Sequence, residues 1–320
     1  MKRTFLVTGG AGFIGSHLTE ALVARGDRVR VVDNLSTGKR SNLAGVASEV
    51  ELIEGDITDA ALMREAVAGV DCVFHQAARA SVPLSVERPL ETHAACVTGT
   101  LTVLDAARRG DVRRVVYAAS SSAYGDQPTA SKRETDLPMP ISPYGAAKLA
   151  GELYAQAFAA TYGLQTVALR YFNVFGPRQD ADSPYSAVIP LFVTALLEGR
   201  PPRIYGDGRQ SRDFTYVANV VQGNLLAADA LDVSGRVINV AMGHTISLLD
   251  LLGKLKTQLG STIEPVHEPP RAGDVRESLA DITLARKLLG YEPAIDFDEG
   301  LRRSLDYYRQ SVGGKAAAAR

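Results

Sequence analysis

Tyr144 and Lys148 are two residues whose types and spacing could perform acid–base chemistry. Ser142-Pro143 is typical of a helix start, because serine is a favoured N-cap and proline fits the first turn. Side chains four residues apart on that helix project from one face. A tyrosine becomes a base near neutral pH when its pKa falls by roughly 3 units, and one adjacent cation typically supplies about 1–3 units. Lysine alone is therefore marginal, and a second cation, such as an oxidised nicotinamide ring, should help.

The same pair has a simpler interpretation, in which an amphipathic helix buries its tyrosine and leaves its lysine in solvent. A lone tyrosine–lysine pair at this spacing recurs by chance in most chains. It indicates catalysis only if the chain also binds a dinucleotide.

The start of the chain predicts such a dinucleotide site. The short apolar strand Phe5–Val7 leads into Gly9, Gly12 and Gly15, and a helix with apolar periodicity follows as far as Arg25. Glycines at these places permit a tight turn, a close approach of the backbone to a pyrophosphate, and close packing of helix on strand. The helix N-terminus offers free N–H groups to the anion.

Asp33 ends the next strand, Val29–Val32, about where a carboxylate should accept hydrogen bonds from an adenosine ribose. A carboxylate there repels a 2′-phosphate, so the position favours NAD over NADP. Lys39 and Arg40 nearby could soften this preference, or could simply belong to a solvated loop.

Strand and helix patterns then alternate, which predicts an α/β fold: a Rossmann-type doubly wound parallel sheet with a smaller α/β substrate-binding domain. We expect one long helix over Pro89–Arg109 and a strand over Val112–Ala118, which delivers Ser120 to the carboxyl edge of the sheet, where open α/β sheets place ligands. His75 is expected to be a histidine of the core or of a strand end. Farther along, we expect a helix over Ile189–Glu198 and a hairpin around Gly206-Asp207-Gly208.

Composition excludes several classes of function. The chain has 320 residues, 46% of them hydrophobic and 22% charged, and a formal net charge of −1, which gives no support to binding of nucleic acid or a membrane surface. Cys72 and Cys96 sit among small or apolar residues and are expected to be packed thiols in a reducing compartment, with no disulfide and no metal site. We see no signal peptide and no stretch long enough to span a membrane, so a cytoplasmic location is expected.

The glycine triplet, Ser120, Tyr144 and Lys148 together resemble the extended short-chain dehydrogenase/reductase family, and within it the nucleotide-sugar epimerases. The resemblance runs from Thr4 to about Leu305. It is carried also by Asp33–Gly38, His75–Ala78, Arg170–Pro177, Gly206–Gly208 with Arg212–Phe214, and Arg271–Asp274.

The resemblance implies that NAD is held by residues from several of these motifs: Gly9, Gly12, Phe13, Ile14, Asp33, Asn34, Ser36, Thr37, Gly38, Asp56, Ile57, Gln76, Ala77, Ala78, Tyr144, Lys148 and Tyr171. Cys96 is a departure, because many relatives have an asparagine against the cofactor at that position. One hydrogen bond to the cofactor is thereby put in doubt.

The resemblance also implies a site for a nucleotide sugar. Arg212 and Arg271 would grip its diphosphate, a task that suits paired guanidinium donors. Tyr205 would flank the uracil, Asp274 would take a ribose hydroxyl, and Asn173 would border nicotinamide and sugar. Ser122, Val188 and Ser278 complete the predicted substrate contacts.

The implied reaction is epimerisation of a UDP-sugar at C4 through a 4-keto intermediate, with catalytic roles for Ser120, Tyr144 and Lys148. Related 4,6-dehydratases carry an Asp-Glu pair directly after the serine, and uronate decarboxylases carry a glutamate at the second of those places. This chain has Ser121 and Ser122, whose hydroxyls cannot serve as acid and base for elimination at neutral pH. In related 4-epimerases a position a few residues past the Arg271–Asp274 motif faces the C2 substituent of the sugar, and a tyrosine there restricts the enzyme to plain hexoses. The equivalent residue here is Ser278, which is small. The resemblance therefore implies that UDP-GlcNAc/UDP-GalNAc is accepted alongside UDP-Glc/UDP-Gal.

Two alternatives stay open. One is another NAD-dependent nucleotide-sugar epimerase or reductase, acting on a UDP-uronic acid, a dTDP-sugar or a GDP-sugar. The other is a non-catalytic NAD(P)-sensing protein of the same fold, which the retention of all three catalytic residues argues against.

We expect an NAD-binding domain over residues 1–172, with a returning segment at about 215–240. A nucleotide-sugar-binding domain would comprise 173–214 and 241–312, and residues 313–320 would form a disordered tail. The resemblance further implies a homodimer that packs through the helices near Pro89–Arg109 and Tyr144–Tyr162.

Overall fold

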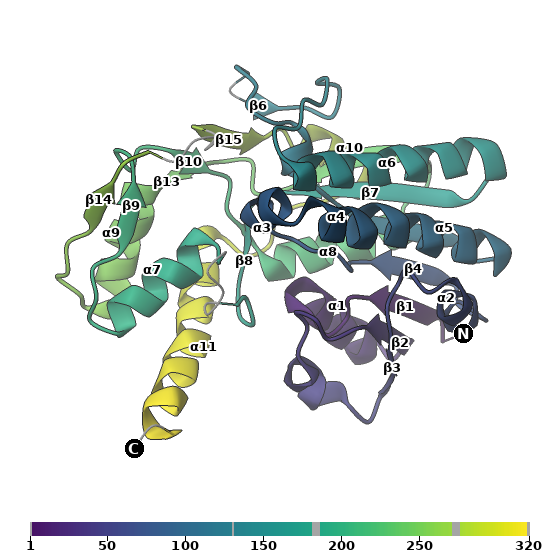
Figure 1. The fold of residues 1–320 in the computed structure, drawn as a ribbon, viewed down its shortest axis with the longest axis horizontal. Coiled ribbons are helices and arrows are strands. Elements are labelled where there is room, and N and C mark those ends of the chain that lie inside the picture. Colours follow the sequence, from purple (N-terminus) through teal and green to yellow (C-terminus); the bar gives the residue numbers. More distant parts are fainter. Residues whose placement is uncertain (1, 130, 181–185, 271–275, 319–320) are drawn as a thin grey trace.

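The structure, a computed structural model, describes residues 2–129, 131–180, 186–270 and 276–318. Within them, a seven-stranded sheet has the strand order β12-β7-β5-β4-β1-β2-β3, and every neighbouring pair is parallel (Figure 1). Its strands are β1 (Thr4–Thr8), β2 (Arg28–Asp33), β3 (Val50–Glu54), β4 (Cys72–His75), β5 (Arg114–Ser120), β7 (Gln165–Tyr171) and β12 (Arg236–Val240). The predicted Rossmann-type sheet is confirmed.

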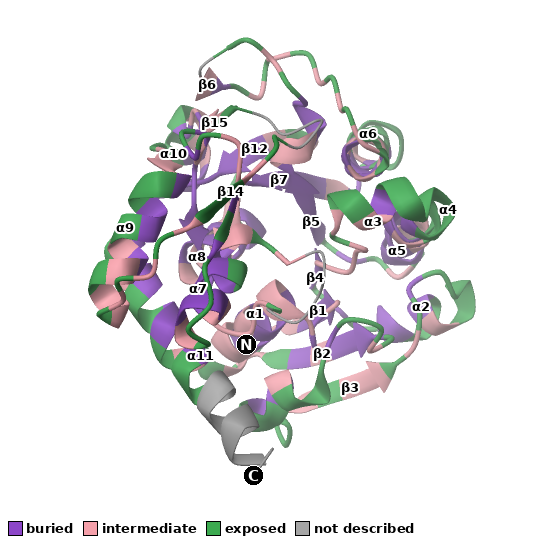
Figure 2. Ribbon diagram, turned by 60° about the vertical axis from the view of Figure 1, so that its left-hand side comes forward, coloured by how far each residue is buried: buried purple, intermediate pink, exposed green. Residues whose placement is uncertain are grey.

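Helices cover both faces of this sheet, as expected for a doubly wound fold. One face packs against α1 (Phe13–Ala24), α8 (Val217–Asp229) and α10 (Thr283–Leu289), and the other against α2 (Ala60–Ala66), α5 (Gly99–Arg109) and α6 (Pro143–Tyr162). Side chains alternate along a strand, so Phe5 and Val7 pack on the face covered by α1, and Leu6 packs on the face covered by α2. The inner strands β4 and β5 are buried along their whole length, as expected for strands that are covered on both faces, and Figure 2 shows them in the colour of buried residues, whereas the edge strand β3 is partly exposed.

A second core lies beside the sheet, at the lower left of Figure 1. It is built by α7 (Val188–Leu197), α9 (Leu248–Leu259) and α11 (Phe297–Ala318), which bring Phe192, Leu251 and Leu301 together. Phe13 and Ile14, at the start of α1, also pack against this cluster. The first helix of the parallel sheet therefore contacts both cores.

Short strands connect the two parts. A four-stranded sheet has the order β13-β10-β15-β6, and two parallel pairs are β11 with β8 and β14 with β9. Their bounds are β6 (Ser131–Lys132), β8 (Val174–Phe175), β9 (Arg203–Tyr205), β10 (Ser211–Arg212), β11 (Thr215–Tyr216), β13 (Ile246–Ser247), β14 (Val266–Glu268) and β15 (Glu277–Ala280). β6 belongs to the connection between β5 and α6, yet it pairs with β15 and so ties that connection to the small sheet.

Two predicted elements differ from the structure. The run predicted as one helix over Pro89–Arg109 comprises α4 (Pro89–His93), a π-helical turn η2 (Ala94–Thr98) and α5. The predicted hairpin around Gly206-Asp207-Gly208 is wrong, because β9 pairs with β14 and β11 with β8, both in parallel. Helix α11 is assigned as far as Ala318, and the disordered tail predicted for 313–320 stays a prediction.

Three short helices complete the described fold: α3 (Val82–Glu87) and the 3₁₀ segments η1 (Arg40–Val46) and η3 (Ser121–Ala123). Among all the described helices, none combines the length and the apolar character that crossing a bilayer requires.

Candidate active site

Helix α6 places Tyr144 and Lys148 on one face, as the sequence predicted. The Ser142 hydroxyl caps the helix by accepting a 3.1 Å hydrogen bond from the Gly145 N–H, and Pro143 occupies the first turn. Gly163 ends the helix with a left-handed φ of 71°. The Tyr144 N–H donates to the hydroxyl of Ser85 on α3 (3.1 Å), which fixes the helix start against a neighbouring element.

Ser120 ends β5 and meets this helix. Its hydroxyl is hydrogen-bonded to the Tyr144 phenol and also accepts the N–H of Ser122 at 3.1 Å. The Lys148 ammonium donates to the Ala118 carbonyl at 2.7 Å and lies 5.0 Å from the centroid of the Tyr117 ring. The structure thus brings the three predicted catalytic residues together at the carboxyl edge of the parallel sheet.

The electrostatics of Tyr144 differ from the expectation that a lysine makes this phenol acidic. Burial raises the pKa of Tyr144 and the nearby Cys96 adds to that rise, while the hydrogen bond from Ser120 opposes it. Burial likewise lowers the pKa of Lys148. In the protein alone desolvation therefore dominates, and a phenolate at Tyr144 requires further positive charge in the site.

The glycine-rich turn fits a dinucleotide. Gly9 adopts φ +70°, and a Cβ there would lie 2.7 Å from the backbone of Ala77, which follows β4. A Cβ on Gly15 would lie 2.1 Å from the Gly9 carbonyl oxygen. The turn between β1 and α1, with Gly12 as the N-cap residue, is therefore possible only without side chains at these places, and it leaves the N-terminus of α1 able to receive a pyrophosphate.

Asp33 and Asn34 stand at the end of β2, where the adenosine is expected. The Asp33 carboxylate accepts the N–H groups of Ala11 (2.9 Å) and Leu35 (2.8 Å), and each of its oxygens keeps a further lone pair for a ribose. The Asn34 amide donates to Asp56 at 2.7 Å. Gly38 packs directly on the Asp33 carboxylate, with Ser36 and Thr37 exposed before it.

The two cations that could have weakened the preference for NAD have acidic partners. Lys39 lies 3.7 Å from Asp180, and Arg40 pairs with Glu54. The remaining predicted contact on this side, Ile57, is buried against Gly99.

Gln76 and Tyr171, both predicted to contact NAD, meet in the structure. The Gln76 amide donates to the Tyr171 hydroxyl (3.1 Å), and both side chains donate to the amide oxygen of Asn224 on α8 (3.1 and 2.9 Å). Ala77 and Ala78 follow Gln76, and both are partly buried. The sequence analysis missed Asn224, although a polar residue within the apolar run of α8 was a signal that could have found it.

His75 and Cys96 are buried close to the predicted catalytic residues. His75 is fully buried between the hydroxyls of Thr8 (2.7 Å from Nδ1) and Thr100 (2.9 Å from Nε2), as expected for a core histidine. Cys96 is a buried free thiol in the π-helical turn, close enough to affect the pKa values of Tyr144 and Lys148. π-Helical turns frequently occur at functional sites, and this one positions the residue that departs from the family pattern.

Part of the predicted sugar site gathers on the small sheet. Arg212 of β10 and Ser278 of β15 are register partners, and the Asp213 N–H donates to the Ser278 carbonyl at 2.8 Å. The Asn173 amide donates to the Asp213 carbonyl at 3.3 Å. Tyr205 ends β9, and Val188 begins α7 and packs against the second core. Arg271 and Asp274 lie outside the described residues.

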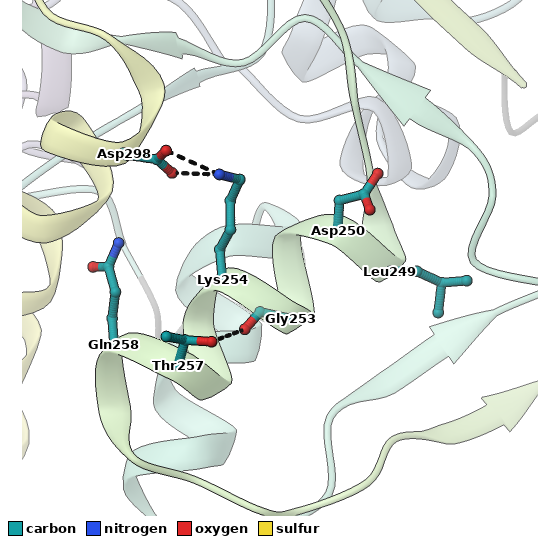
Figure 3. A pocket seen from close by; sticks show the side chains of 7 residues that line it. All are labelled: Leu249, Asp250, Gly253, Lys254, Thr257, Gln258 and Asp298. Atoms are coloured by element: carbon teal, nitrogen blue, oxygen red, sulfur yellow. Dashed lines mark hydrogen bonds and ion pairs between the residues drawn. The ribbon is translucent and has the colours of Figure 1, made fainter.

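A shallow hollow elsewhere on the surface has no comparable chemistry. It lies between α9 and α11 and is lined by Leu249, Asp250, Gly253, Lys254, Thr257, Gln258 and Asp298 (Figure 3). Its lysine is bound by Asp298 at 2.7 and 2.9 Å, so this cation is already neutralised. The carboxyl edge of the parallel sheet remains the candidate active site.

Comparisons with known proteins agree with this geometry. Residues 5–241 match the model of the NAD dependent epimerase/dehydratase family. A putative UDP-glucose 4-epimerase from Methanocaldococcus jannaschii is 36% identical over 96% of this chain and 98% of its own length. Among solved structures, a UDP-N-acetylglucosamine 4-epimerase from Methanobrevibacter ruminantium is 41% identical with a TM-score of 0.93, covering 97% of this chain and 100% of that one. A UDP-glucose 4-epimerase from Thermotoga maritima is 39% identical with a TM-score of 0.92, covering 97% and 99%. The chain therefore belongs to the NAD dependent epimerase/dehydratase family.

Proposed function

We propose that this protein is a UDP-sugar 4-epimerase that uses tightly bound NAD and accepts both UDP-Glc/UDP-Gal and UDP-GlcNAc/UDP-GalNAc. The observation that carries the proposal is the convergence of Ser120, Tyr144 and Lys148 at the carboxyl end of β5. The glycine turn that fits a dinucleotide opens at the same edge of the sheet.

Each of the three residues has a distinct task. Tyr144 removes the proton from the C4 hydroxyl of the sugar and later returns it. Ser120 already hydrogen-bonds the Tyr144 phenol, so it can share the hydrogen bonds of the reacting oxygen. Lys148 supplies a positive charge one helical turn away, which favours the phenolate. The chemistry that bound NAD supplies is acceptance of the C4 hydride and its return to the opposite face of the ring.

The residues around Tyr144 favour epimerisation over elimination. Ser121 and Ser122, in η3, follow the catalytic serine directly, and the N–H of Ser122 is used to hold Ser120. Loss of water from C5 and C6 needs an acid and a base besides the tyrosine, and serine hydroxyls are not ionised at neutral pH. Epimerisation needs only that the 4-keto sugar turn over before the proton and hydride return.

Substrate breadth is proposed from the small sheet. Ser278 is partly exposed and lies opposite Arg212, one of the two arginines assigned to the diphosphate. A serine at position 278 leaves room beside the sugar for a C2 N-acetyl group, which a large side chain would exclude.

The presence of two separate hydrophobic cores supports two domains, one that binds the cofactor and one that binds the substrate. We assign NAD to residues 1–172 with the returning segment at about 215–240, and the nucleotide sugar to 173–214 and 241–312. α8, in the returning segment, packs on the parallel sheet and contributes Asn224, whereas α7 and α9 belong to the second core.

We also propose a homodimer through α3, α4 and α6. α3 and α4 pack beside α6, and several large apolar side chains on these helices face solvent: Val82, Val86, Leu90, Leu153 and Tyr154. Figure 1 shows α4 and α6 on one side of the sheet, and Figure 2 shows how much of α4 is exposed. A second copy of the chain would cover this surface.

A panel of nucleotide sugars tests the proposed reaction. Purified protein is incubated with UDP-Glc, UDP-GlcNAc, UDP-glucuronic acid, dTDP-glucose and GDP-mannose, and the products are separated by chromatography. The proposal expects the C4 epimers of the first two. Conversion of UDP-glucuronic acid or dTDP-glucose alone, or a 4-keto-6-deoxy product, would replace it by one of the alternatives, and no conversion at all would favour a sensing role.

A further inference from the structure

Glu152 continues the row begun by Tyr144 and Lys148. The three residues are spaced by four along α6 and therefore share one face of the helix. Lys148 and Glu152 are almost completely buried, with 3% and 1% of their surface exposed. A buried carboxylate thus lies one helical turn from the ammonium that the proposed reaction requires.

Both oxygens of that carboxylate are bound by Arg170 of β7. Arg170 Nε donates to Glu152 Oε1 at 2.9 Å, and Arg170 Nη2 donates to Oε2 at 2.7 Å. The Arg170 side chain is 3% exposed and the Glu152 side chain 1%. The parallel, two-pronged geometry is the strongest arrangement open to a guanidinium and a carboxylate.

Lys148 forms no ion pair with Glu152 in the structure. Lysine and glutamate four residues apart on a helix are close enough to form a salt bridge, and in a buried site the attraction between them is stronger than in water. Lys148 instead donates to the Ala118 carbonyl, next to the strand end that carries Ser120. The titratable groups that face Lys148 are Tyr144 and Glu152 on its own helix, Tyr117 on β5, His75 on β4 and Cys96 on the π-helical turn.

We propose that Arg170 is a positioning residue: by binding both oxygens of Glu152, it prevents this carboxylate from drawing the Lys148 ammonium along α6, away from Tyr144 and Ser120. The inference rests on the roles proposed above for Tyr144 and Lys148. It gives the buried ion pair a task beyond stability.

Arg170 is itself held on the side away from Glu152. Its guanidinium carbon lies 4.4 Å from the centroid of the Tyr124 ring. The Tyr124 hydroxyl donates to Asn239 at 2.7 Å, and Asn239 is the register partner of Arg170 on β12. The guanidinium is thus aimed at Glu152 by the central sheet.

A purely structural ion pair makes a different prediction from a positioning one. Removing either partner leaves one buried charge unpaired, so Arg170→Met and Glu152→Gln should both destabilise the fold. Only Arg170→Met, however, leaves a free carboxylate that can capture Lys148. A structural role therefore predicts similar effects of the two substitutions on turnover, and a positioning role predicts different ones.

The test compares Arg170→Met, Glu152→Gln and the double variant, with kcat measured per folded molecule well below each thermal transition. We expect Arg170→Met to lower kcat by roughly tenfold or more with KM for the UDP-sugar unchanged. The reason is that a rise of about one unit in the pKa of Tyr144 lowers the fraction of phenolate about tenfold. Glu152→Gln should keep kcat close to that of the unaltered protein, and the double variant should regain it. Tyr124→Phe keeps the Glu152–Arg170 ion pair and the aromatic ring, and removes only the hydroxyl that bonds Asn239 and Arg170. It is the control for loss of a buried polar contact beside Arg170 and should keep kcat.

A spectroscopic readout separates this inference from the proposed function. The phenolate absorbance of Tyr144 is titrated in NAD-loaded protein, and Arg170→Met should move the transition to higher pH while Glu152→Gln should not. Equal losses of kcat in the two single variants, or an unmoved transition in Arg170→Met, would overturn the positioning role. If no nucleotide sugar is turned over, or if Tyr144→Phe keeps its turnover, the proposed function fails, and the titration still decides the role of Arg170.

Discussion

The Lys148 ammonium lies 2.7 Å from the carbonyl oxygen of Ala118, the residue that precedes Ala119 and Ser120 on β5. A helix residue is thereby tied to the strand end that carries the catalytic serine. The contact explains how two motifs separated in sequence form one site, because α6 cannot slide along β5 without breaking it.

The acidity of Tyr144 should depend on positive charge brought into the site. Burial raises the pKa of this phenol in the protein alone, so at neutral pH it is protonated. Addition of NAD should lower that pKa by about 1–3 units, the effect of one adjacent cation. The measurement is the ultraviolet absorbance of phenolate against pH, with and without NAD, taken as the difference between the unaltered protein and Tyr144→Phe. An identical transition in the two conditions would refute the dependence on the cofactor.

Ser278→Tyr should restrict the substrates to plain hexoses. Ser278 lies opposite Arg212, and a tyrosine there would occupy the space assigned to a C2 N-acetyl group. We expect turnover of UDP-GlcNAc to fall by at least about tenfold, an energy of about 1.4 kcal/mol, while turnover of UDP-Glc is kept. Both activities are measured on the same preparations. Unchanged N-acetyl activity in the variant would remove the basis for the predicted breadth.

His75 should make the fold sensitive to acid. Burial, with a smaller contribution from the charge of Lys148, lowers the pKa of His75 to about 3 in the folded protein. A histidine in the unfolded chain has a pKa of about 6.5. Between about pH 3 and pH 6.5 the unfolded state therefore binds a proton at His75 that the folded state does not bind. Stability from this residue is therefore complete above pH 6.5 and falls as the pH drops toward 3, by about 1.4 kcal/mol per pH unit.

His75→Gln keeps a polar side chain between Thr8 and Thr100 but cannot titrate. The difference in free energy of unfolding between the unaltered protein and this variant, measured in urea, should shrink by about 3 kcal/mol between pH 7 and pH 4. A difference that stays constant over this range would show that His75 does not govern the acid response.

Leu90→Glu should disrupt the proposed homodimer. Leu90 is 83% exposed on α4, within the apolar surface of α3, α4 and α6. Burying an unpaired charge in the interface would weaken association of the two copies. Light scattering should therefore report a monomer or a concentration-dependent mixture. Leu231→Glu is the matched control, because Leu231 is 81% exposed outside these helices and its substitution should leave the mass unchanged. A monomeric unaltered protein would contradict the proposal at once.

Local sequence patterns were enough to predict helix α6 and the glycine-rich turn between β1 and α1. The serine–proline start of α6, the left-handed Gly163 at its end and the glycines between β1 and α1 are signals within a few residues of one another. The parallel sheet follows from alternating strand and helix patterns, because parallel strands need helical crossovers.

Contacts between distant segments were not predictable in the same way. The pairing of β9 with β14 joins residues near 204 to residues near 267, whereas the local turn signal favoured a hairpin. The raised pKa of Tyr144 depends on burial by surrounding elements, which a single helix pattern cannot reveal. Asn224 and Arg170 likewise acquire their roles only when α8 and β7 are placed beside Tyr171 and Glu152.

The central claim is that Tyr144 exchanges the proton of the sugar hydroxyl during epimerisation at C4. The most direct measurement compares the unaltered protein and Tyr144→Phe on UDP-GlcNAc and UDP-Glc, after matching their NAD content and confirming that both are folded. The unaltered protein should bring each substrate to a mixture of C4 epimers, and the variant should lose at least about a thousandfold in kcat, within the range of positioned proton transfer. Epimer formation by Tyr144→Phe at a rate close to that of the unaltered protein would contradict the account.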